Sequence, residues 1–290
     1  MSRTKILVTG ANGQLGNELR LLESAYPGFH FLFESRQGLP IHDYERMLRF
    51  FEANHPAFCI NCAAYTAVDK AESEKEQAYL INAQAVGRLA EICRREQCRF
   101  LHISTDYVFD GKSSVPYKEN DPVDPVNVYG ASKLAGERLA LELNKESVII
   151  RSSWLYSTFG NNFVKTMIGL MGKKPEINVV NDQTGSPTYA ADLAGAIMHI
   201  INFKEWIPGI YHYSNAGKTT WYGFAMAIRH LIGSNCKIHP IPGSQYPNAA
   251  KRPAYSLLDT ALIRTRFGLS IPVWEKSLEL CVKKIKRSNG

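Results

Sequence analysis

Short apolar runs alternate with segments of helical spacing along the first half of the chain. Runs that end at glycine or polar residues predict strands over residues 5–9, 30–33, 58–61, 100–104 and 147–152. Segments with apolar residues three or four positions apart predict helices over 15–22, 44–54, 79–96 and 130–143. Short strands that are apolar throughout are typical of a parallel sheet buried on both faces. The pattern therefore predicts an α/β fold with a Rossmann-type, doubly wound parallel sheet.

The pattern loosens in the second half. Residues 181–189 and 239–256 are rich in Gly, Pro, Asn and Ser, which predicts loops. Helical spacing returns at 190–201, 220–232 and 273–286. We therefore expect a sheet domain over residues 1–153, to which later segments return, and a smaller C-terminal lobe built mainly from 154–290 and interleaved with it.

Composition and charge narrow the class of protein. Of the 290 residues, 45% are apolar and 21% are charged, which is near the average for folded domains. No apolar run approaches the roughly 20 residues that span a bilayer, and the first residues lack the long apolar core of a secretion signal. The net charge of +7 has its one obvious cluster at 283–287. We expect a cytoplasmic protein that binds neither membrane nor nucleic acid.

The six cysteines favour a structural role. Cys59 and Cys62 form a C-x-x-C pair, but they lie in an apolar, strand-like run and no second such pair follows. Metal-binding and redox motifs usually offer more ligands or a different context. We expect free thiols in a reducing compartment and no metal site.

A glycine-rich turn follows the first predicted strand directly. Gly10, Gly13 and Gly16 lie three residues apart where this strand gives way to a helix. The first glycine lets the chain turn, the second lets backbone N–H groups approach a pyrophosphate, and the third allows close packing of helix and strand. The helix N-terminus adds partial positive charge. The turn predicts that the sheet domain binds a nicotinamide dinucleotide.

The ribose of such a cofactor should meet the end of the second strand, about 20 residues after the glycines. Glu34 and Arg36 stand at this point. A carboxylate favours the free 2′-hydroxyl of NAD, whereas a guanidinium suits the 2′-phosphate of NADP. The choice between the two cofactors therefore stays open. Asp43 either reaches the adenine region or caps the helix that follows it.

Tyr129 and Lys133 are four residues apart, so they share one face of a predicted helix. An unperturbed tyrosine has a pKa of about 10, too high for ready proton exchange at neutral pH. A nearby ammonium favours the phenolate and lowers that pKa. The pair therefore predicts an acid–base catalyst for a carbonyl or alcohol centre.

Hydroxyl groups stand at the end of the fourth predicted strand. Ser104, Thr105 and Asp106 lie where a parallel sheet binds its ligands. A hydroxyl of Ser104 or Thr105 would hydrogen-bond a substrate carbonyl oxygen beside the tyrosine, or else cap the strand end.

Together, the glycine turn, the strand-end hydroxyl and the Tyr-x-x-x-Lys pair resemble the extended short-chain dehydrogenase/reductase family. The likeness is strongest to members that reduce dTDP-4-keto-6-deoxy sugars at C4. It runs through CAAYTAVDKAE (62–72), STDYVFDG (104–111), NVYGASKLAGE (127–137), RSSWLY (151–156), NNFVKTM (161–167), NDQTGSPTYAADLA (181–194) and KRPAYSLLD (251–259). The resemblance implies NADPH or NADH as cofactor, a dTDP-sugar substrate bound by the C-terminal lobe, a homodimer and stimulation by Mg²⁺.

The resemblance also implies roles at matched positions. Tyr129 would protonate the reduced oxygen, while Lys133 would lower its pKa and hold the nicotinamide ribose. Thr105 and Asp106 would touch the sugar. The other matched positions are Gly13, Gln14 and Leu15 at the pyrophosphate turn, Ala63, Ala64 and Tyr65 beneath the cofactor, Trp154 beside the substrate and Arg252 at the nucleotide diphosphate.

Three related activities need separate consideration. A dehydratase of this superfamily carries Glu after the strand-end Asp, where this chain has Tyr107, so the acid for elimination is missing. Nothing in the sequence excludes a sugar-nucleotide epimerase. A non-catalytic NADP-binding subunit, resembling the regulatory subunit of methionine adenosyltransferase, is the third alternative, although the retained Thr105, Tyr129 and Lys133 favour activity.

Overall fold

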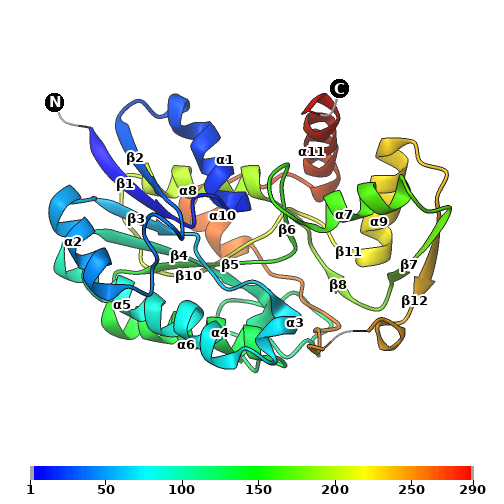
Figure 1. Cartoon of the computed structure of the whole chain (residues 1–290), viewed down its shortest axis with the longest axis horizontal. Coiled ribbons are helices and arrows are strands. Elements are labelled where there is room, and N and C mark those ends of the chain that lie inside the picture. Colours follow the sequence, from blue (N-terminus) through cyan, green and yellow to red (C-terminus); the bar gives the residue numbers. More distant parts are fainter. Residues whose placement is uncertain (1–2, 248, 289–290) are drawn as a thin grey trace.

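Six parallel strands form the centre of the molecule in the computed structural model, which describes residues 3–247 and 249–288 (Figure 1). Their order across the sheet is β10-β5-β4-β3-β1-β2. The bounds are β1 (Thr4–Thr9), β2 (Phe29–Glu34), β3 (Phe58–Asn61), β4 (Arg99–Thr105), β5 (Val148–Ser152) and β10 (Gly209–Tyr213). The chain goes from β1 to β2 on one side and then crosses to β3 on the other, so the strand order reverses at β1. The predicted doubly wound parallel sheet is confirmed.

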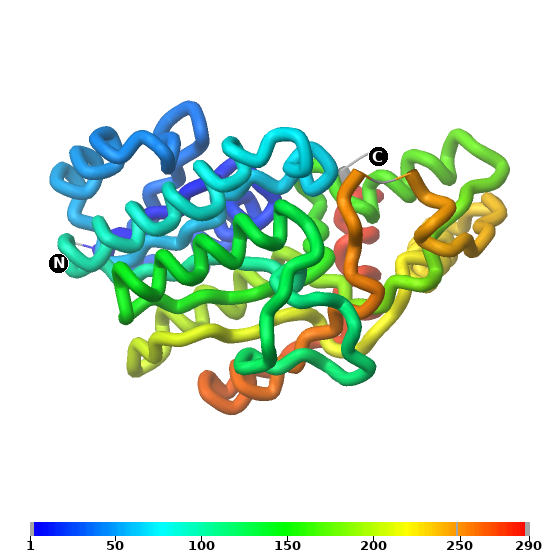
Figure 2. The backbone as a smooth tube through the Cα atoms, turned by 90° about the horizontal axis from the view of Figure 1, so that it is seen from below, coloured from blue at the N-terminus to red at the C-terminus, as the bar shows by residue number. Residues whose placement is uncertain are grey.

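Helices cover both faces of this sheet. One face carries α1 (Gln14–Leu22), α8 (Ala190–Ile201) and α10 (Ala261–Phe267), and the other carries α2 (Tyr44–Asn54), α5 (Ala85–Arg95) and α6 (Val128–Leu143) (Figures 1 and 2). Ile6 and Val8 of β1 pack with α1 and α8, while Leu7 between them packs with α2 and α5. Because successive strand residues point to opposite faces, a sheet covered on both faces favours consecutive apolar residues, as in β1.

A smaller lobe lies beside the carboxyl end of the sheet. Its core joins the parallel pair β7 (Glu176–Val180) and β12 (Lys237–Ile241) to α7 (Phe163–Met171), α9 (Trp221–Ile232) and α11 (Trp274–Ser288). Two short pairs connect it to the sheet domain: β6 (Leu155–Tyr156) with β9 (Thr188–Tyr189), and β8 (Thr184–Gly185) with β11 (Thr219–Thr220). Residues 184–185, 188–189 and 239–241, predicted as loop, are therefore strands.

The predicted helix over 79–96 is interrupted. The chain forms α4 (Lys75–Tyr79), then a π-helical turn (Leu80–Gln84), and only then α5. Gly136 of α6 lies so close to this turn that a Cβ atom there would collide with the carbonyl oxygen of Asn82. The irregular turn therefore belongs to the contact between two neighbouring helices, which periodicity within one helix does not show.

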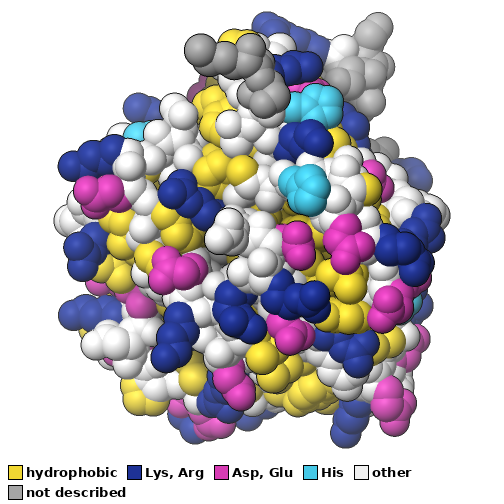
Figure 3. Space-filling view, turned by 90° about the vertical axis from the view of Figure 1, so that its left-hand side faces the viewer, with side chains coloured by type: hydrophobic (Ala, Val, Ile, Leu, Met, Phe, Trp, Pro, Cys, Tyr) yellow, Lys and Arg dark blue, Asp and Glu magenta, His cyan; other side chains and the backbone are white. Residues whose placement is uncertain are grey.

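The remaining sequence-based expectations concern thiols and surface charge. All six cysteines are free. At the end of the sheet domain away from the lobe, basic and acidic side chains are interspersed (Figure 3). Within residues 3–247 and 249–288, no helix has the length and apolar character needed to cross a membrane.

Candidate active site

A cleft of about 1140 Å³ opens where the carboxyl edge of the sheet meets the lobe. Its walls come from the loops after β1, β2, β4 and β5, from the segment between β3 and α5, from α6 and from the first residue of α9. The strand order reverses at β1, and this reversal is where open α/β sheets bind ligands. The topology therefore places the cleft at the position expected of a ligand site.

The glycine turn forms one wall of the cleft. Gly10 has φ of +65°, and a Cβ atom on it would lie 2.6 Å from the backbone nitrogen of Ala63. Gly16 packs so closely that its Cβ would lie 2.6 Å from Cα of Ala11. Gly13 caps α1 without a side-chain hydrogen bond, and its Cβ would point to open space apart from the Gly10 carbonyl oxygen at 3.1 Å. A bare helix N-terminus facing a cleft fits a pyrophosphate.

The other expected cofactor residues divide into two groups. Gln14, Leu15 and Arg36 line the cleft, whereas Glu34 and Asp43 are not among its lining residues. The carboxylate of Glu34 turns toward Gly38 instead. Asp43 accepts a hydrogen bond from the backbone nitrogen of Arg46 at 3.1 Å, which makes it the N-cap of α2. Of the two roles considered for Asp43, the structure shows helix capping.

The side chain of Asn82, which sequence analysis did not single out, holds the segment after β3. Ala63, Ala64 and Tyr65 line the cleft. The buried Asn82 side chain accepts from the backbone nitrogen of Tyr65 at 2.8 Å and donates to its carbonyl oxygen at 3.0 Å. It also donates to Ser132 Oγ at 3.0 Å. Asn82 thus joins the cleft floor to α6, and only tertiary structure brings these segments together.

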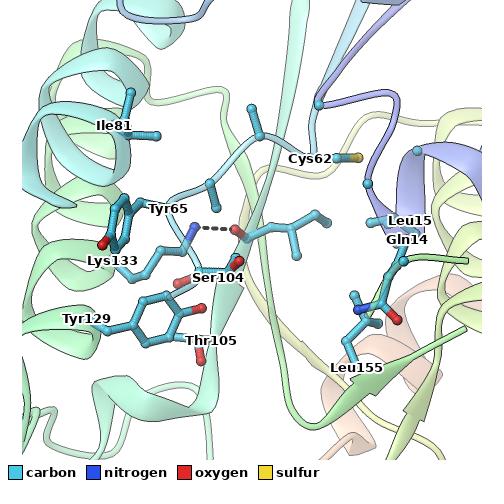
Figure 4. A pocket seen from close by; sticks show the side chains of 18 of the residues that line it. Gln14, Leu15, Cys62, Tyr65, Ile81, Ser104, Thr105, Tyr129, Lys133 and Leu155 are labelled. Atoms are coloured by element: carbon cyan, nitrogen blue, oxygen red, sulfur yellow. Dashed lines mark hydrogen bonds between the residues drawn. The ribbon is translucent and has the colours of Figure 1, made fainter. Parts of the chain in front are cut away.

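Tyr129, Thr105 and Ser104 lie together on one side of the cleft, opposite Gln14 and Leu155 (Figure 4). Burial raises the pKa of Tyr129 to about 12, and its hydrogen bond with Thr105 opposes that rise. Thr105 Oγ1 donates to Asp106 Oδ1 at 3.0 Å. Burial also raises the pKa of Asp106 to about 7. At neutral pH the tyrosine therefore keeps its proton.

The Lys133 side chain is held by residues of β4. Its Nζ donates to the carbonyl oxygen of Ile103 at 2.6 Å (Figure 4) and lies 3.1 Å from Nε2 of His102. Burial lowers the pKa of Lys133 to about 8. The expected lowering of the pKa of Tyr129 by Lys133 is not found in this structure, because desolvation of the phenol dominates.

Of the four expected substrate residues, Thr105, Asp106 and Trp154 line the cleft and Arg252 does not. Trp154 lines the cleft in a left-handed conformation, with φ of +46°, and its ring stacks on Trp221. Trp221, which sequence reasoning missed, is the first residue of α9. Arg252 is not among the lining residues, and its two terminal guanidinium nitrogens donate to Asp69 at 3.1 and 2.7 Å. In the described part of the chain, no three His, Cys, Asp or Glu residues gather as a metal site.

This geometry, a dinucleotide turn facing a Thr–Tyr–Lys group across one cleft, agrees with the comparison to known families. The model of the RmlD substrate binding domain family matches residues 4–287. The chain belongs to this family. The match spans the sheet domain and the lobe alike, and it confirms the resemblance found from the sequence blocks.

Individual members of the RmlD family match over nearly the whole chain. The spore coat polysaccharide biosynthesis protein SpsK of Bacillus subtilis is 43% identical, over 95% of this chain and 95% of its own. A dTDP-4-dehydrorhamnose reductase of Burkholderia thailandensis is 41% identical, over 97% and 99%. The crystal structure of dTDP-4-dehydrorhamnose reductase from Bacillus anthracis in complex with NADP superimposes with a TM-score of 0.93 at 38% identity, covering 98% of this chain and 100% of that one.

Proposed function

We propose that this protein is an NAD(P)H-dependent reductase that converts dTDP-4-dehydro-L-rhamnose to dTDP-L-rhamnose. The observation that carries the proposal is the single cleft that holds both the glycine turn and Thr105, Tyr129 and Lys133. The names of the similar enzymes from Burkholderia thailandensis and Bacillus anthracis support the choice of substrate.

The proposed cofactor residues are those that line the cleft around the bare N-terminus of α1. Gly13, Gln14 and Leu15 would hold the pyrophosphate through backbone N–H groups. Arg36 would meet the adenine ribose, and Ala63 to Tyr65 would lie beneath the cofactor. The bound nicotinamide would supply a hydride to the keto carbon.

Tyr129 is the proposed proton donor. Its raised pKa keeps the phenol protonated at neutral pH, so a proton is available when negative charge develops on the C4 oxygen. Thr105, which the Tyr129 hydroxyl meets, would hydrogen-bond the same oxygen. Lys133 would hold the nicotinamide ribose and favour return of a proton to Tyr129 after it has protonated the C4 oxygen.

The substrate side of the site would come mainly from the lobe. Trp154 and Trp221 present stacked rings to the cleft, which suit the apolar face of a sugar or a base. Asp106 would touch the sugar. Arg252 would have to exchange Asp69 for the diphosphate of the substrate. We extend the proposal to the expected division of labour, with residues 1–153 binding the dinucleotide and 154–290 mainly the sugar, and to a cytoplasmic homodimer.

The proposal is tested by Tyr129→Phe, assayed with dTDP-4-dehydro-L-rhamnose and with each cofactor. General acid catalysis contributes about 10²–10⁴-fold, so kcat should fall at least a hundredfold while cofactor affinity stays. Tyr107→Phe is a matched control, because that ring meets Tyr129 edge-on at 5.7 Å and carries no proposed proton. Full turnover in Tyr129→Phe would contradict the mechanism. A wild-type protein that binds NADPH but turns over no keto sugar would instead favour the non-catalytic subunit.

A further inference from the structure

A row of buried hydrogen bonds runs behind the cleft from β1 to α6. It joins Thr9, Asn61, His102 and Lys133, whose side chains lie on β1, β3, β4 and α6. None of the four is more than 1% exposed. Of these residues only Lys133 has a place in the proposed reaction, so the structure raises the question of what the other three do.

The orientation of the Asn61 amide assigns the donors and acceptors in this row. Asn61 Oδ1 accepts from the backbone nitrogen of Ala63 at 3.2 Å and from Thr9 Oγ1 at 2.6 Å. A backbone N–H is always a donor, so the amide orientation of Asn61 is fixed. Its Nδ2 then donates to Nδ1 of His102 at 2.9 Å. His102 Nδ1 is therefore the bare nitrogen, and in the neutral ring the proton lies on Nε2.

That tautomer faces Lys133. The Nε2–H of His102 points at Nζ, 3.1 Å away, while Nζ itself donates to the Ile103 carbonyl oxygen. A neutral amine accepts such a bond, whereas an ammonium has no lone pair for it. To accept from an ammonium, His102 would need the other tautomer, and that would set its Nδ1–H against the Nδ2–H of Asn61.

We propose that His102 is a positioning residue that disfavours the ammonium form of Lys133 in the free protein, with Asn61 fixing its tautomer. The idea rests on the proposed function only for the role of Lys133 in catalysis. With a pKa of about 8, Lys133 carries a growing fraction of the amine form, held against Ile103, as the pH of the free protein rises toward that value. An anionic cofactor in the cleft would favour the ammonium form again.

The other groups around Lys133 are consistent with this assignment. Glu137 on the same helix and the Cys62 thiol after β3 favour the cation, yet burial outweighs them and leaves the pKa of Lys133 below its ordinary value. Glu137 is itself bound by Arg151 through two nitrogens. Burial and Lys133 together outweigh the hydrogen bond with the Asn61 backbone, which raises the pKa of His102, and hold that pKa well below the usual range, so the ring stays neutral. His102 does not relay protons along this row, because the side-chain amide of Asn61 next to it carries no titrating proton.

The test is an NMR titration of the free protein with ¹³Cε-labelled lysine, in which the Lys133 signal is identified by its loss in Lys133→Met. In His102→Gln, the side-chain amide has an oxygen that can accept a hydrogen bond from the ammonium. We expect Lys133 to titrate about one pH unit higher in this variant than in the wild type, a shift typical of one changed neighbour. His212→Gln is the matched control, because that buried histidine also faces a cation, Arg151, at 3.4 Å. It should leave the Lys133 titration unchanged.

A second measurement needs no variant of His102 to fold. Imidazole ¹⁵N shifts of the wild type should show a protonated Nε2 and a bare Nδ1 for His102. The opposite tautomer would overturn the proposal, and so would an unchanged Lys133 titration in folded His102→Gln. Both measurements use protein without cofactor or substrate, so they stand whether or not the chain reduces keto sugars. If it does, the alkaline limb of kcat should move to higher pH in His102→Gln and not in His212→Gln.

Discussion

The indole rings of Trp154 and Trp221 lie parallel, with 3.6 Å between their centroids and 9° between their planes. Trp154 reaches this position through a left-handed backbone conformation, and a Cβ atom on Gly185 would come within 2.8 Å of its ring. A strained backbone in a bulky residue persists only where its surroundings hold it. The pair is therefore a fixed aromatic wall that joins the end of β5 to the lobe.

Replacing Trp221 tests that wall. Trp221→Ala should raise KM for the sugar nucleotide about twofold to tenfold, because an aromatic pair contributes about 0.5–1.5 kcal/mol beyond buried area. Cofactor affinity should stay the same. Trp221→Phe keeps a ring and should recover most of the loss in steady-state kinetics. An equal loss of cofactor affinity would mean that the pair supports the cleft as a whole.

Substitutions at Gly13 and Gly16 should affect different properties, cofactor affinity at Gly13 and folding stability at Gly16. Gly13→Val should place its branches toward the cleft and weaken NADPH binding about tenfold or more, equivalent to ~1.4 kcal/mol, in a folded protein. Gly16→Val should instead lower the free energy of unfolding by about 1–3 kcal/mol, because its Cβ meets the Ala11 backbone. Fluorescence titration and denaturant unfolding separate the two effects. Unchanged NADPH affinity in Gly13→Val would show that the pyrophosphate does not bind at this turn.

Arg36 bears on the choice of cofactor. It lines the cleft while Glu34 does not, which favours a 2′-phosphate over a free 2′-hydroxyl. Arg36→Ala should weaken NADPH about tenfold more than NADH, since a charge-assisted bond is worth about 1.5–3 kcal/mol. Parallel titrations of the two cofactors measure the difference. Equal losses would show that the guanidinium does not meet the ribose.

The buried carboxyl of Asp106 should make stability depend on pH. Its pKa rises from 3.8 to about 7 in the folded chain, because burial penalises the charged form. The stabilisation from a raised pKa is complete below the unfolded value and is lost as pH rises through the folded value. Relative to Asp106→Asn, the wild type should therefore lose up to about 4 kcal/mol of unfolding free energy between about pH 4 and pH 7. Urea denaturation at a series of pH values measures this difference. If the unfolding free energies of the two proteins changed in parallel with pH, the raised pKa of Asp106 would be contradicted.

The sequence predicted what local pattern determines. The central strands, the glycine turn and the helix that carries Tyr129 and Lys133 each follow from apolar periodicity or a short motif within one segment. The elements it missed lie mainly in the second half, among them α7, β7, β8, β9, β10, β12 and α10. Of these, β10 pairs with β5, which lies more than 50 residues earlier, and such pairing leaves no local signature.

The site residues that the sequence identified are likewise those marked by a local motif. Tyr129 and Thr105 were found because their motifs are local, and they meet in the cleft. Asn82, Trp221 and His102 act through contacts with residues remote in sequence, so no motif marks their roles. Arg252 was matched to a ligand, but the structure shows it bound to Asp69. A sequence match identifies the residue, whereas only geometry shows the partner it has before a ligand arrives.

The late arrival of β10 and α8 has a consequence during synthesis. On the ribosome, strands β1 to β5 emerge first, and the face that carries Ile6, Val8 and Ile150 has only α1 to cover it until α8, more than 35 residues after β5, has emerged. Until β10 follows, β5 is an unpaired edge strand open to pairing with other chains. Domains usually fold as units from the N-terminus during translation. A nascent chain of this protein therefore exposes part of that face and the β5 edge until about residue 213 has emerged.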